Sequence, residues 1–171
     1  MTPYFLLLTI VISIIFISII YKLYPSFQTQ SQLTAHTAKA FVITCMDFRL
    51  IDDAVYFLDS KGYNNNYDEI ILAGASLGYN QTKYNSWKKT VDDHINLAKK
   101  LHHIKDIIVI DHMDCGAYKL IYEKPKMSRK EEIELHKSNF QTFEYLIKKS
   151  YPELTVETYL MDIDGKMVDL R

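Results

Sequence analysis

Several features are scarce in this 171-residue sequence, and each scarcity excludes a class of protein. Two cysteines are too few for a disulfide framework, although one disulfide between Cys45 and Cys115 is possible. The 20 basic and 21 acidic residues nearly cancel and form no basic stripe, so nucleic acid is not expected as a partner. The sequence contains no internal repeat. Hydrophobic residues make up 48% and charged residues 24%, a globular composition that excludes a disordered chain.

Charge is absent from the start of the chain, where residues 5–20 form one apolar run. At a rise of about 1.5 Å per residue, this run would cross most of a hydrocarbon core about 30 Å thick. The flanking Tyr4 and Tyr21 suit the membrane interface. We therefore predict that residues 1–22 form a single-pass transmembrane anchor. Lys22 follows the apolar run, which favours a cytosolic location for the rest of the chain.

Two alternatives to an anchor are a cleaved signal peptide and a helix buried in a core. The segment has no basic start and no convincing small-residue cleavage site, which argues against a signal peptide. Residues 23–38 are polar, contain a proline and lack helical periodicity, so we predict a tether. Residues 39–171 have the usual size of one globular domain.

In this predicted domain, short apolar runs alternate with helical patterns. The runs predict strands at residues 40–44, 69–73, 106–110 and 155–161, and the 3.6-residue spacing predicts helices at 50–61, 88–103 and 129–149. The alternation predicts an α/β fold with a mostly parallel central β-sheet flanked by helices. Ligand sites in such sheets form at the carboxyl ends of the strands.

Metal-binding side chains follow two of these predicted strands. Cys45 comes directly after the first, and His112 and Cys115 follow the third, so the three can converge. The His-x-x-Cys spacing lets one tight turn, permitted by Gly116, present an imidazole and a thiolate to one ion. Two cysteines and one histidine leave tetrahedral zinc one open position, as in catalytic sites. We therefore predict zinc on Cys45, His112 and Cys115.

The remaining polar candidates have simpler interpretations. Asp47 and Arg49, two residues apart, could be an ordinary ion pair. His94 is expected to pack near the apolar face of its helix. His136 lies in a charged helical segment and is assigned no role.

Two motifs together resemble those of the β-carbonic anhydrase family. They are C-x-D-x-R and H-x-x-C-G, carried by Cys45, Asp47, Arg49, His112, Cys115 and Gly116. The resemblance extends from about residue 40 to the C-terminus. It implies a β-carbonic anhydrase-like fold, one zinc ion per subunit, and a homodimer or higher homo-oligomer.

The resemblance also implies an activity and two catalytic residues. The reaction is the reversible hydration of carbon dioxide to bicarbonate by a zinc-bound hydroxide. Asp47 would orient this hydroxide, and Arg49 would keep Asp47 ionised and away from the metal. A guanidinium beside a carboxylate lowers the pKa of that carboxylate, which is consistent with this assignment.

The chain departs from the family pattern at several places. The family usually carries an arginine-containing R-x-A-G-[NG] stretch after its second strand, but the stretch from Ile71 to Gly78 contains no arginine. Phe48 is bulkier than the small residue common there, and the anchor and tether replace the usual N-terminal helices. Two alternatives follow: a hydrolase of carbonyl sulfide or carbon disulfide, or a catalytically weak, membrane-tethered zinc-binding module.

Overall fold

The computed structural model of the chain describes residues 12–16, 18 and 36–170. The chain divides into two units, residues 1–35 and 36–171. Most of the predicted anchor at residues 1–22 and most of the predicted tether at 23–38 lie outside the described residues. Within the described part of the chain, no helix has both the length and the apolar character needed to cross a membrane.

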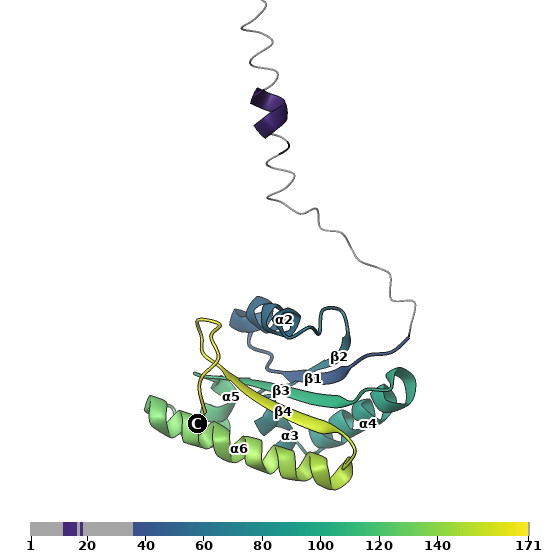
Figure 1. Cartoon of the computed structure of the whole chain (residues 1–171). Coiled ribbons are helices and arrows are strands. Elements are labelled where there is room, and N and C mark those ends of the chain that lie inside the picture. The colour runs from purple at the N-terminus through teal and green to yellow at the C-terminus, as the bar shows by residue number, and fades with distance from the viewer. Residues whose placement is uncertain (1–11, 17, 19–35, 171) are drawn as a thin grey trace, which may run out of the picture. The chain divides into compact units, whose positions relative to one another are not determined.

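The second unit is built around one parallel sheet of four strands (Figure 1). The strands are β1 (Ala40–Thr44), β2 (Tyr67–Ile71), β3 (Asp106–His112) and β4 (Thr155–Met161). Their order across the sheet is β2-β1-β3-β4, so β1 and β3 are the inner strands. The predicted α/β fold with a parallel sheet is therefore confirmed.

The second strand lies two residues earlier than predicted, at 67–71 instead of 69–73. The chain turns after Ile71, and the Ala75 N–H donates to the Leu72 carbonyl at 2.8 Å. The apolar residues Leu72 and Ala73 thus belong to the turn. Periodicity alone does not separate a short strand from an apolar turn.

Helices cover both faces of the sheet. One face carries α2 (Ile51–Ser60), which follows a short 3-10 turn at Phe48–Leu50, and the other carries α3 (Ser76–Asn80), α4 (Asn85–His102) and α6 (Arg129–Ser150) (Figure 1). The six-residue α5 (Gly116–Ile121) packs through Tyr118 near Leu77 of α3. Local sequence explains two of the boundaries. Ser128 and Glu131 form a capping box that starts α6, and Gly62, at φ 82°, follows the end of α2.

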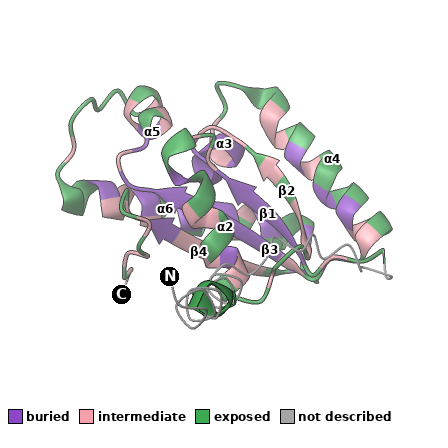
Figure 2. Cartoon of the chain, turned by 90° about the horizontal axis from the view of Figure 1, so that it is seen from above, coloured by how far each residue is buried: buried purple, intermediate pink, exposed green. Residues whose placement is uncertain are grey.

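The core is divided between the two faces because side chains alternate along a strand. Phe41 and Ile43 of β1 point into the larger cluster, which includes Phe143 of α6. Val42 points to the opposite cluster with Leu58 of α2. All five residues of β1 are buried, as Figure 2 shows for the centre of the sheet. The carboxyl ends of β1 and β3 are therefore held by core packing on both faces.

Two histidines differ from expectation. His94 is exposed, with its Nδ1 2.8 Å from the Thr90 carbonyl, so the prediction that it packs against apolar residues is wrong. Its helix turns Val91, Ile95 and Ala98 toward the core instead. The charged neighbours of His136 in the sequence suggest a solvated side chain, but its exposure is 0%.

The packing of α6 leads to a stability prediction. Phe143→Ala should lower the free energy of unfolding by about 3–5 kcal/mol, because it removes a fully buried ring from the core. Tyr145→Ala, two residues away and 64% exposed, is the matched control and should change it by about 0.5 kcal/mol or less. Urea unfolding curves measure both. Equal shifts would contradict this account of the core.

Candidate metal centre

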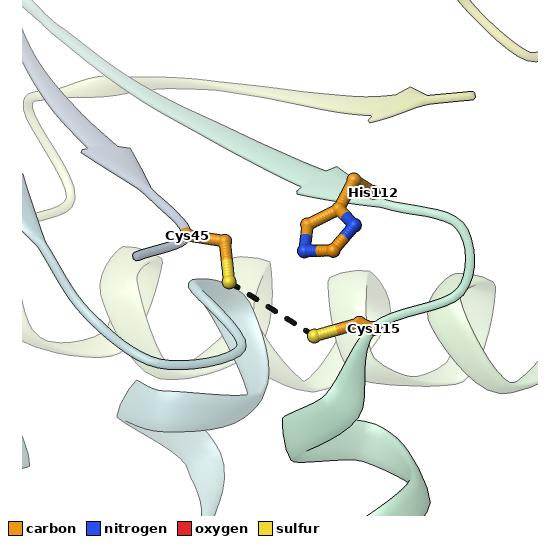
Figure 3. Close-up of side chains that lie close together, drawn as sticks. All are labelled: Cys45, His112 and Cys115. Atoms are coloured by element: carbon orange, nitrogen blue, oxygen red, sulfur yellow. Dashed lines mark hydrogen bonds between the residues drawn. The ribbon is translucent and has the colours of Figure 1, made fainter. Parts of the chain in front are cut away.

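Three chain segments bring Cys45, His112 and Cys115 together (Figure 3). Cys45 follows the last residue of β1, His112 ends β3, and Cys115 is the N-cap of α5. Their ligand atoms all lie within 4.8 Å of one another, and the two sulfurs are 3.9 Å apart. Cys115 and His112 are buried, and Cys45 is partly buried.

The donor set fits zinc. With Zn–S bonds of about 2.3 Å, tetrahedral coordination places two sulfurs about 3.8 Å apart, close to the observed separation. The Nδ1 of His112 lies 2.8 Å from the Met113 carbonyl, to which it can donate, leaving Nε2 as the ligand atom. Nε2 is buried and has no hydrogen-bond partner among the described residues. A buried, unpartnered imidazole nitrogen beside two thiols is suited to a metal ion.

Electrostatics favour a thiolate at Cys45. The hydrogen bond with Cys115 lowers the pKa of Cys45 to about 4, and His112 also lowers it, against the opposing effect of burial. The same contact with Cys45, together with burial, raises the pKa of Cys115. Burial lowers the pKa of His112, but the closeness of the ring to the Cys45 thiolate outweighs burial, so the pKa of His112 is raised. Cys45 is thus the thiol that loses its proton first, in the form that binds metals.

A tight turn supports Cys45 from the side of β2. The Gly74 N–H donates to the Cys45 sulfur at 3.3 Å. Gly74 has φ 78°, and the next residue, Ala75, has φ 41°, a value rare for a residue with a side chain. Ala75 is completely buried, so its surroundings hold this strained conformation in place.

Asp47 and Arg49 form a two-pronged ion pair beside the cluster. Arg49 Nε lies 2.9 Å from Asp47 Oδ1, and Nη2 lies 2.8 Å from Oδ2. These hydrogen bonds lower the pKa of Asp47 to about 2. Asp47 Oδ2 is 3.8 Å from His112 Nε2, so the carboxylate faces the nitrogen that would bind a metal.

Asp114 is a further member of this charged group that sequence reasoning missed. Its Oδ2 lies 2.9 Å from Arg49 Nη1, and its Oδ1 accepts a hydrogen bond from Lys119. Its backbone N–H donates to Glu132 at 2.6 Å. Asp114 occupies an unspecified position of the H-x-x-C motif, so only its acidic character could have drawn attention to it. It accepts a hydrogen bond from Nη1 of Arg49, whereas Asp47 contacts Nε and Nη2.

A small cavity opens next to the cluster, with a volume of about 70 Å³. Its lining includes Cys45, Asp47 and His112. The lining also includes several apolar side chains, among them Leu50, Ile51, Ala54, Val55, Ile71, Ile110 and Met161. One water needs about 10–15 Å³ measured in this way, so the cavity admits a molecule of a few heavy atoms.

The sequence is similar to a protein family and to two bacterial proteins. Residues 35–168 match a protein-family model described as "Putative carbonic anhydrase". An uncharacterized protein of Rickettsia bellii is 40% identical over 133 residues, which cover 77% of this chain and 81% of that protein. An uncharacterized protein of Rickettsia conorii is 38% identical over 133 residues, covering 77% and 72%.

Two solved structures are more distant. A β-carbonic anhydrase of Aspergillus fumigatus aligns with a TM-score of 0.48 at 11% identity, covering 95% of this chain and 90% of that chain. A structure reported for two tetrameric β-carbonic anhydrases of Sordaria macrospora gives 0.49 at 11% identity, covering 97% and 96%.

The geometry of the cluster predicts zinc binding. We expect Cys45→Ser and Cys115→Ser each to lose zinc and to lower thermal stability, because metal binding is coupled to folding. His94→Gln, an exposed histidine outside the cluster, should keep full zinc content and is the control. Metal analysis of the purified proteins measures this. A wild-type protein without zinc, or with a Cys45–Cys115 disulfide, would show the prediction to be wrong.

Proposed function

The chain belongs to this carbonic anhydrase family, and on that premise we propose that it hydrates carbon dioxide reversibly to bicarbonate. We propose that Cys45, His112 and Cys115 hold the zinc ion and that Asp47 and Arg49 are the catalytic pair. One observation carries the proposal: three ligand atoms within 4.8 Å of one another lie beside a carboxylate held by two guanidinium hydrogen bonds.

In this proposal Asp47 supplies a hydrogen-bond acceptor next to the place where the nucleophile would form. Zinc, when bound, would lower the pKa of a water molecule to about 7 and so supply a nucleophile near neutral pH. Asp47, with its pKa lowered to about 2, stays ionised and would accept a hydrogen bond from that nucleophile. A hydrogen bond to Asp47 would orient the nucleophile so that an oxygen lone pair points at the substrate carbon.

Arg49 has two tasks in the same proposal. Its paired hydrogen bonds fix the plane of the Asp47 carboxylate and compensate its charge, so Asp47 has little tendency to become a metal ligand. Its third contact, from Nη1 to Asp114 at 2.9 Å, keeps the guanidinium from turning. Asp114 is in turn paired with Lys119, so the whole group is a network and is more rigid than one surface ion pair.

The cavity suits a small neutral substrate. Its lining is mainly apolar, and the volume of about 70 Å³ admits only a few heavy atoms. Carbon dioxide fits this description. Carbonyl sulfide and carbon disulfide are also small, linear and apolar, so they form the alternative substrates and belong in the same assay.

The catalytic pair generates the central prediction. Asp47→Asn and Arg49→Ala should each keep zinc but lower the hydration rate by about 10² to 10³, as loss of one positioned hydrogen-bond partner does elsewhere. The double variant should be little worse than either single one, because the two side chains act as a unit. Exchange of isotope-labelled carbon dioxide and metal content are measured together.

A matched surface pair provides the control for this experiment. Lys89 and Asp93 form an exposed ion pair on α4, so Lys89→Ala and Asp93→Asn remove one positive and one negative charge elsewhere. These variants should keep the wild-type rate. Single variants of Asp47 and Arg49 with wild-type rates and full zinc would remove the pair from the mechanism. A zinc-loaded wild type that is inactive with all three substrates would favour the binding module.

We also propose that residues 1–22 anchor the protein in a membrane with the zinc domain on the cytosolic side. Support comes from the uncharged apolar run at residues 5–20 and from Lys22 behind it. The homodimer or higher homo-oligomer that the resemblance implies likewise stays a prediction.

Deleting residues 1–22 tests the anchor. The full chain should stay with the membrane fraction after an alkaline wash, and the deletion variant should be recovered in the soluble fraction with its zinc. Leu97→Ser replaces an exposed apolar residue of α4 and is the control. It should leave the full chain in the membrane fraction. A full chain released by the wash, or a mature N-terminus beyond Tyr21, would contradict the anchor.

A further inference from the structure

Four buried side chains meet on the opposite side of β3 from α2. Asp111 precedes His112 in β3, and its carboxylate contacts Ser76, Tyr118 and His136 from α3, α5 and α6. The Ser76 N–H and hydroxyl donate to it at 2.9 and 2.6 Å, and the Tyr118 hydroxyl donates at 2.5 Å. His136 Nδ1 lies 2.9 Å from Asp111 Oδ2. None of the four is more than 1% exposed.

We propose that Asp111, Ser76, Tyr118 and His136 are positioning residues for the metal centre, and that His136 is its most remote member. The inference rests on the proposed zinc site but not on the identity of the substrate. These side chains lie outside the three candidate ligands and outside the Asp47–Arg49 pair. Their role is to hold the ligands apart at the spacing that the metal requires.

Each segment that carries a ligand is connected to Asp111. His112 is the next residue in β3. Tyr118 lies on α5, the helix for which Cys115 is the N-cap. Ser76 is two residues beyond Gly74, whose N–H donates to the Cys45 sulfur at 3.3 Å. One carboxylate thus links the strand of His112, the helix of Cys115 and the turn that contacts Cys45.

The physical constraint is the cost of burying a carboxylate without hydrogen bonds. Asp111 is 1% exposed, so its oxygens depend on protein donors. Four donors from three helices meet this requirement, and all must keep their places together. When one donor is lost, the others shift to compensate, and they carry the ligand segments with them. Outer partners of metal ligands typically change metal affinity about 10–100-fold when they are substituted.

Substitutions of His136 can distinguish a positioning role from a packing role, because this side chain makes both a polar contact and a ring contact. Its ring packs against Tyr118 with centroids 3.9 Å apart, and its Nδ1 reaches Asp111. Its Nε2 has no hydrogen-bond partner in the part of the chain that the structure describes. The hydrogen bond from Nδ1 to Asp111 is therefore the polar contribution of His136. An asparagine at this position could replace that donor, because its amide nitrogen is the same number of bonds from Cα as Nδ1 of histidine.

The experiment compares His136→Leu with His136→Asn in the full-length protein. Leucine fills more of the buried space but cannot donate, whereas asparagine leaves a gap and keeps the donor. We expect His136→Leu to weaken zinc binding about 10–100-fold in competition with a chelator and to alter the visible spectrum of the cobalt-substituted protein. His136→Asn should lie closer to the wild type in both measurements. A packing role predicts the opposite order.

Tyr118→Phe is a second variant, which removes one hydroxyl and retains the ring. It should weaken zinc binding in the same direction, because the Asp111 carboxylate loses its 2.5 Å donor. Phe143→Leu, on the same helix as His136 but outside the cluster, controls for loss of stability. It should lower the melting temperature and leave zinc affinity and the cobalt spectrum unchanged.

Unchanged zinc affinity and an unchanged cobalt spectrum in both His136→Leu and Tyr118→Phe would overturn the inference. So would a Phe143→Leu variant that loses zinc as readily as they do. The proposed function fails separately, if the zinc-loaded wild type hydrates no carbon dioxide while its variants still differ in metal affinity. A wild type that binds neither zinc nor cobalt would overturn both.

Discussion

The parallel pairing of β1 with β3 is the constraint on which the candidate site depends. The two strands pair in register from Ala40 opposite Asp106 to Thr44 opposite Ile110. Because parallel strands end at the same edge of a sheet, Cys45 and His112 emerge side by side although they are far apart in the chain. Core residues on both faces hold this register, since a shift by one residue would turn every buried side chain to the wrong face. The spacing of the ligands is thus a consequence of core packing.

Two carboxylates near the carboxyl edge of the sheet, those of Asp47 and Asp111, have different environments. Asp47 lies on the cavity side, and its guanidinium partner is partly exposed to solvent. The carboxylate of Asp111 points to the opposite face of the sheet, where it is buried and accepts hydrogen bonds from three helices. A carboxylate paired near solvent keeps its charge and stays available as an acceptor. A buried carboxylate with four hydrogen bonds to protein donors is shut off from solvent and ligands, and its contribution is rigidity.

The turn after β2 shows how a departure from a family pattern is accommodated. The stretch from Ile71 to Gly78 lacks the arginine of the family pattern, yet the turn is well held. The Gly74 N–H contacts the Cys45 sulfur, and Ser76 donates twice to Asp111. The substitution of Ala for Gly74 would meet the Ala117 side chain at 3.2 Å and would also conflict with φ 78°. Backbone conformation and a buried carboxylate therefore secure this turn without an arginine.

The sequence by itself determined the order of the four strands and the three longer helices, and the polar residues at the strand ends, because those signals are local. The short helices α3 and α5 were not predicted. The apolar run at residues 40–44 predicted a buried strand directly before Cys45, and the structure has that strand with the same bounds. Only the tertiary structure decided which face of α6 meets the sheet, and so buried His136 in a helix whose charges suggested a solvated surface. It likewise joined Arg49 to Asp114, 65 residues apart, and left His94 exposed. Contacts of this kind depend on how whole elements pack against each other, and the spacing of residues within one element does not specify such contacts.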